Sequence, residues 1–161
     1  MTTTKSTIQE WLNAAVDATE ELSTTALGFE GTEVLATQES LPHDLAGSYI
    51  ALVGEETSLQ VGLASSDAGV MILAKALLGM DPDDEEALSE SDVSDALGEI
   101  ANIVAGGVKN RMADRDPSMK LGLPMIVHGH VQATDRMQTA IADVRIGPVE
   151  AQLLVLREGS A

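Results

Sequence analysis

The first third of the chain changes from a helical to an alternating hydrophobic spacing. Apolar residues such as Ile8, Leu12 and Val16 recur at every fourth position, which predicts an amphipathic helix over residues 6–27. Gly28 can end this helix, because glycine readily adopts the left-handed conformation found at helix ends. The spacing then shortens toward two, and it predicts a strand at 33–37 and a hairpin of strands 48–53 and 58–64.

Two further helices and three further strands follow. Ser66 or Asp67 caps a helix that ends at Gly79, and a longer helix spans about 92–113. Between them, residues 81–92 are strongly acidic. We interpret them as a solvated loop, because they lack the ligand spacing and central glycine of an EF-hand calcium loop. After the long helix, alternation predicts strands at 119–130, 137–146 and 149–157.

This order of elements predicts a single α+β domain over residues 1–161, with an antiparallel sheet packed against long helices. Hydrophobic residues make up 44% of the chain, which is enough to form a core. Aromatic residues make up only 2%, so Leu, Ile, Val, Met and Ala must supply most of that core.

The charge of the chain narrows its possible partners. Nine basic residues against 26 acidic ones give a formal net charge of −17. This charge argues against nucleic acids and anionic membrane surfaces as partners, because both attract cationic proteins. A protein with a basic rim is compatible with this charge, although many soluble proteins are simply acidic. The chain has no cysteine, which excludes thiol chemistry, and no apolar run of about 20 residues. We therefore expect a cytoplasmic protein.

The long predicted helix carries a narrow polar ridge. At about 100° per residue, the positions that fall within roughly 60° of one another are Asp95, Glu99, Asn102 and Gly106. The apolar positions between 93 and 108 form a stripe on the opposite side. A surface helix normally has a polar face, so the ridge alone does not indicate a function.

Glycines distinguish this ridge from an ordinary surface. Gly98, Gly106 and Gly107 each cost up to about 1 kcal/mol relative to alanine in a helix. Because glycine has no side chain, these positions predict a surface that another backbone can approach closely. Because Glu99 and Asn102 are separated by three positions, both side chains can reach one partner site.

A carboxamide beside a carboxylate suits a particular kind of chemistry. The amide is neither a base nor a nucleophile at neutral pH, but it can hold a water molecule at a fixed angle. Hydrolysis of a phosphoryl group depends largely on such positioning. The carboxylate can act as a base or pair with a cation on the partner. No Lys or Arg stands on the ridge, so the partner would have to neutralise a phosphate.

These residues carry a resemblance to a known family. Segment 95–102 reads Asp-x-x-x-Glu-x-x-Asn, and Pro124 follows in the next predicted strand. This pattern resembles the motif of the CheC/CheX/FliY chemotaxis phosphatases. The loop 78–80 and the pair Ala105-Gly106 resemble CheX in particular. The resemblance implies a CheC-like fold and a cytoplasmic enzyme that hydrolyses the aspartyl-phosphate of a CheY-like response regulator.

The resemblance also implies roles for individual residues. Asn102 would insert its amide into the regulator's active site and orient the attacking water. Glu99 would pair with the regulator's conserved lysine. The remaining residues expected to contact the partner are Asp95, Gly98, Gly106 and Pro124. The chain would need no cofactor of its own, because Mg²⁺ would be held by the regulator.

CheX-like members carry one helix with the Glu-x-x-Asn motif and pair as dimers, whereas CheC-like members carry two such helices. The first helix of this chain offers no second Glu-x-x-Asn motif, so one site per chain and a homodimer are implied. Gly107 departs from the asparagine that often stands there in CheX-like helices. The alternative function is a non-catalytic adaptor of the same fold, which binds a regulator or a flagellar or signalling partner.

Two histidines form the one other candidate cluster. His128 and His130 alternate with Gly129 on a predicted strand, so both side chains point to the same face. They could share a metal ion, but no third ligand is evident nearby. We interpret them as ordinary strand histidines and predict no metal site.

Overall fold

The computed structural model describes residues 7–38, 45–55, 57–81, 83–84, 86–129 and 136–158. Within them, the elements in chain order are α1 (Ile8–Thr25), β1 (Thr32–Gln38), β2 (Leu45–Val53), β3 (Ser58–Ser65), α2 (Asp67–Leu77), α3 (Glu90–Arg111), β4 (Lys120–Leu121), β5 (Met125–Gly129), β6 (Met137–Ile146) and β7 (Val149–Glu158). The strands form one antiparallel sheet in the order β1-β6-β7-β3-β2-β4, and β5 also pairs with β2. The predicted α+β class is confirmed.

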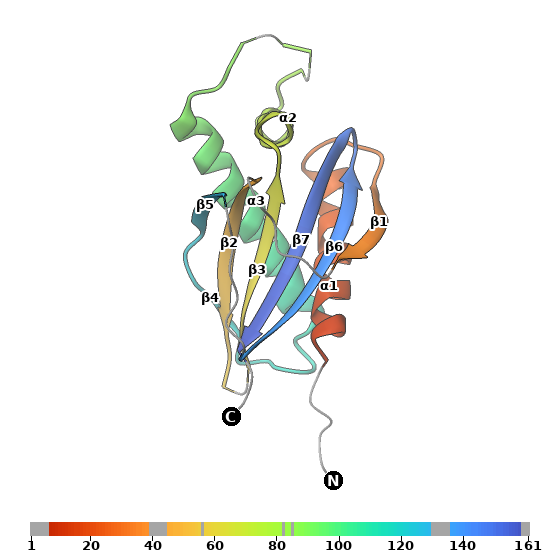
Figure 1. The fold of residues 1–161 in the computed structure, drawn as a ribbon, viewed down its shortest axis with the longest axis vertical. Coiled ribbons are helices and arrows are strands. Elements are labelled where there is room, and N and C mark those ends of the chain that lie inside the picture. Colours follow the sequence, from red (N-terminus) through yellow and green to blue (C-terminus); the bar gives the residue numbers. More distant parts are fainter. Residues whose placement is uncertain are drawn as a thin grey trace.

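Helices α1 and α3 pack against one face of the sheet and against each other (Figure 1). Their apolar stripes contribute Trp11, Leu22, Ile100 and Val104, all at most 1% exposed, to the main core. Helix α2 lies near one end of the sheet and is seen end-on in Figure 1. In the described part of the chain, none of the helices has the length and apolar character to span a membrane.

The helix starts follow from capping side chains. The Ser66 hydroxyl accepts a hydrogen bond from the Gly69 N–H at 3.1 Å, so Ser66 is the cap and α2 begins at Asp67. The Ser89 hydroxyl likewise accepts from the Asp92 N–H at 3.1 Å. The predicted start of α3 at residue 92 is therefore late, because Ser89 caps the helix and Glu90 is its first residue.

The predicted strand at 119–130 is wrong as one continuous element. It consists of the short strand β4 and then β5, both paired to β2. The Gly122 N–H still donates to the Ala51 carbonyl at 2.8 Å, but Pro124 has no N–H to donate. Pairing therefore resumes only at Met125, opposite Tyr49.

The opposite face of the sheet holds a smaller cluster around Tyr49. The aromatic ring of Tyr49 lies over Gly62, where an added Cβ would clash with ring carbon Cδ1. Burial raises the pKa of the Tyr49 phenol to about 12, because the charged phenolate is poorly solvated there.

Candidate functional site

A groove lies between the polar ridge of α3 and the segment that joins β4 to β5. Its volume is about 500 Å³. The lining residues are Ser94, Asp95, Gly98, Glu99, Asn102, Pro124 and Ile126. The structure thus brings Pro124 beside the motif residues of the helix, although it is distant from them in sequence. Gly106 lies one turn beyond Asn102 and is not among the lining residues.

The side chains of the ridge are accessible. Asp95, Glu99 and Asn102 are exposed, whereas the neighbouring Leu97 and Ile100 are buried. Within the described residues, the side chains of Glu99 and Asn102 make no hydrogen bond or ion pair. Both polar groups are therefore available to an external partner.

The glycines of α3 serve different purposes. An added Cβ at Gly98 would lie 3.3 Å from Cγ of Pro124, so Gly98 allows this proline to pack closely on the helix. An added Cβ at Gly107 would lie 2.7 Å from Cβ of Ala18, so Gly107 allows α1 and α3 to approach. The prediction of an open surface at all three glycines is thus wrong for Gly98 and Gly107. Only Gly106 has free space above it, with nothing within 4 Å.

Two lining residues were not predicted from the sequence. Ser94 precedes Gly98 by one helical turn, and Ile126 follows Pro124 on the same face of the strand segment. Both positions could have been found from the helical and strand periods once Asn102 and Pro124 were chosen. Neither adds charge, so among the described residues of the lining the carboxylates of Asp95 and Glu99 are the only charged groups.

A second cavity, of about 400 Å³, adjoins the groove and shares Ser94 and Ile126 with it. Its wall is mostly apolar, and His128 is exposed at it together with Asp67 and Glu90. The predicted partner His130 lies outside the described residues. No group of three or more potential metal ligands occurs among the residues that the structure describes.

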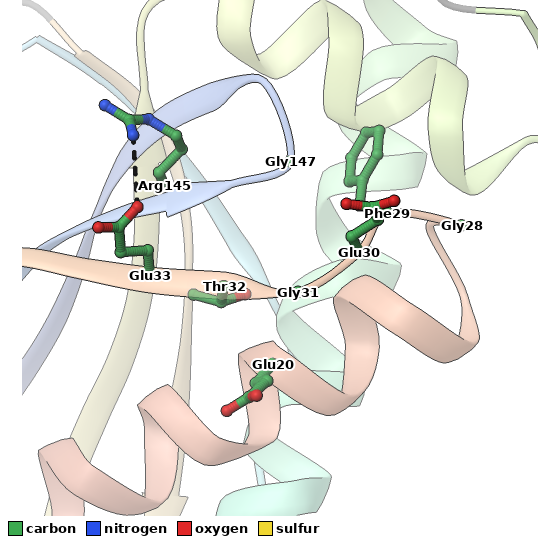
Figure 2. Close-up of a pocket in the computed structure, with 9 residues that line it drawn as sticks. All are labelled: Glu20, Gly28, Phe29, Glu30, Gly31, Thr32, Glu33, Arg145 and Gly147. Carbon is green, nitrogen blue, oxygen red and sulfur yellow. Dashed lines mark hydrogen bonds and ion pairs between the residues drawn. The ribbon is translucent and has the colours of Figure 1, made fainter.

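A larger hollow, of about 580 Å³, lies where the loop after α1 meets the turn between β6 and β7 (Figure 2). The Phe29 ring packs over Gly147, where an added Cβ would come within 2.5 Å of it. The Arg145 guanidinium lies 3.3 Å from the Glu33 carboxylate and 3.6 Å from that of Glu150. None of the predicted site residues lines this hollow.

Comparisons with known proteins agree with the fold. No curated protein matches the chain by sequence. A CheX from Desulfovibrio desulfuricans is similar in structure, with a TM-score of 0.78, 15% identity, and coverage of 92% of this chain and 99% of that one. The complex of CheX with CheY, BeF3 and Mg²⁺ from Borrelia burgdorferi gives a TM-score of 0.74, 16% identity, and coverage of 98% and 100%.

The fold extends beyond CheX itself. The FliM middle domain from H. pylori has a TM-score of 0.61 at 12% identity, with coverage of 93% of this chain and 92% of that one. At such low identities these structures establish the fold alone. The model of the family described as "Chemotaxis phosphatase CheX" matches residues 46–142, which include the whole of α3 and Pro124. This match spans more than half of the sequence, and the chain belongs to the CheX chemotaxis phosphatase family.

Proposed function

We propose that this chain hydrolyses the aspartyl-phosphate of a CheY-like response regulator, with Asn102 positioning the attacking water. The observation that supports it best is the pair of exposed side chains, Glu99 and Asn102, which have no partner within the described residues. Membership of the CheX phosphatase family supports the reaction class. The Borrelia burgdorferi CheX bound to CheY supports the kind of partner.

In the proposed reaction, water oxygen forms a bond to phosphorus while the bond from phosphorus to the regulator's carboxylate oxygen breaks. Inorganic phosphate leaves and the aspartate is regenerated. The Asn102 amide holds the water through its donor and acceptor atoms, and so lowers the entropic part of the barrier. Mg²⁺ belongs to the regulator and neutralises charge on the phosphoryl group. This chain contributes no metal.

Glu99 and Asp95 would act in docking. The Glu99 carboxylate lies one turn of α3 from Asn102 in the same groove, where it can pair with a lysine beside the phosphoryl group. Asp95 extends this acidic stripe by a further turn. Gly98 and Pro124 fix the groove wall, and Gly106 leaves room beyond Asn102 for the partner's backbone.

The test is phosphate release from a phosphorylated CheY-like regulator in the presence of Mg²⁺. Asn102→Ala should no longer accelerate phosphate release, although it should still bind the regulator. Glu99→Ala should weaken binding by about 2 kcal/mol or more if its carboxylate pairs with a lysine in the complex. Asn110→Ala is the matched control, because Asn110 is exposed on the same helix but outside the groove, and it should behave as wild type.

A non-catalytic adaptor is the second candidate. The likeness to the FliM middle domain favours it, because the same fold occurs in a protein that is not named as a phosphatase. Wild-type chain that binds the regulator without ever accelerating phosphate release would favour the adaptor and contradict the enzyme.

Two further properties are proposed from the family resemblance, a cytoplasmic location and a homodimer with one site per chain. Light scattering at micromolar concentration would contradict the dimer if it gave only the monomer mass.

A further inference from the structure

The segment beside the groove exposes an unusual amount of apolar surface. Leu123 is 90% exposed and Met125 is 54% exposed, and these residues flank Pro124 on either side. Single exposed apolar residues are common and need no explanation. Here, however, two large side chains stand on either side of Pro124, which packs against Gly98 of the motif helix.

The backbone explains why Leu123 points away from the core. Hydrogen bonding to β2 continues to Gly122, and strand pairing resumes at Met125. In between, Pro124 packs against Gly98 of α3, and its Cγ lies 3.3 Å from where a Cβ added at Gly98 would stand. The contact fixes the interrupted segment on the helix, and the neighbouring Leu123 is left in solvent.

The negative charge of the groove disfavours the binding of an anionic partner, so contacts of another kind must add affinity. Its lining contains two carboxylates, Asp95 and Glu99, and no Lys or Arg. A phosphorylated aspartate is itself strongly anionic, and the chain carries a formal net charge of −17. Long-range electrostatics therefore oppose the approach of such a partner, and apolar burial would add affinity to that of the proposed pair between Glu99 and a lysine.

The usual size of a protein interface implies that a partner bound at Asn102 also contacts Leu123 and Met125. A standard interface buries about 800 Å² on each side, which corresponds to a disc of roughly 16 Å radius. Asn102 and Pro124 line one groove, and consecutive Cα atoms are about 3.8 Å apart. A globular partner centred on Asn102 therefore covers both residues.

We propose that Leu123 and Met125 form an apolar anchor for the response regulator, and that they supply affinity for the site in which Asn102 positions the water. This proposal rests on the proposed function and adds a second contact surface to it. On the opposite flank of the ridge, Ile103 is 38% exposed and extends the apolar rim. The regulator surface that fits is apolar and borders its phosphorylation site.

The experiment compares Leu123→Gln and the double variant Leu123→Gln/Met125→Gln with wild type. Burial of one leucine corresponds to about 10- to 100-fold in affinity, so KM should rise by about that factor while kcat stays near wild type. Leu78→Gln is the matched control, because Leu78 is 53% exposed at the end of α2 and does not line the groove. Trp11 fluorescence checks folding, and light scattering gives the mass of every variant.

The possible results separate this proposal from its alternatives. A raised KM at unchanged mass supports the anchor, and an unchanged KM overturns it. A raised KM accompanied by a lower mass would assign the surface to a second copy of this chain and would also overturn the proposal. If wild type binds the regulator without hydrolysis, the proposed function fails, but weaker binding by Leu123→Gln at unchanged mass still supports the anchor. If wild type neither binds nor hydrolyses the regulator, both fail.

Discussion

The groove beside α3 and the hollow beside β1 have similar volumes, about 500 and 580 Å³, but their polar lining residues differ. In the hollow, Arg145 is paired with Glu33 (Figure 2) and, outside the lining, with Glu150. The carboxylates of Glu20 and Glu30 also line the hollow and have no partner within the described residues. In the groove, Glu99 and Asn102 have no partner within the described chain. A free surface carboxylate costs little, because water solvates it. Neither volume nor free carboxylates therefore distinguish the two regions, whereas the free carboxamide of Asn102 occurs in the groove alone among the described lining residues.

The largest effect expected from this difference concerns Asn102. Asn102→Asp keeps the size of the side chain but replaces the N–H donors with a negative charge that repels the phosphoryl group. We expect phosphate release at saturating regulator to fall by about 10²- to 10³-fold, as for the loss of one positioned donor in other enzymes. The measurement is kcat, with Asn110→Asp as the control. A fall in kcat of less than twofold would contradict the role of the amide.

A second, smaller effect separates the two adjacent glycines of α3. Gly106→Ala should stabilise the protein by about 0.5–1 kcal/mol, because alanine favours the helix and its Cβ meets nothing within 4 Å. Gly107→Ala should instead destabilise it by about 1–3 kcal/mol, because its Cβ would lie 2.7 Å from Cβ of Ala18. Urea unfolding followed by the fluorescence of Trp11, the only tryptophan, measures both free energies. Equal effects would mean that α1 and α3 adjust at no cost.

The same pair of glycines shows what the sequence can and cannot predict. The helical period placed Asp95, Glu99 and Asn102 on one exposed face, because that period depends only on local geometry. It could not distinguish Gly106 from Gly107, since the difference arises from Ala18 on another helix.

The β4–β5 segment shows the same limit. Its apolar spacing predicted a continuous strand, but Pro124 has no N–H to donate to β2 and packs against Gly98 of α3. The hairpin of β2 and β3 was predicted correctly, because a turn and two alternating runs adjacent in sequence specify it. Contacts between distant segments therefore decide the details of the site that the sequence alone leaves undetermined.

The smallest effect is expected in the hollow. Arg145→Met removes two ion pairs whose members are all at least 46% exposed, so the free energy of unfolding should fall by less than about 1 kcal/mol. Phosphate release and KM for the regulator should stay within twofold of wild type, because Arg145 does not line the groove. Steady-state kinetics beside urea unfolding would check both expectations. A raised KM at unchanged stability would place the hollow in the partner interface. In that case, the internal pairing of Arg145 would not exclude a binding role for the hollow.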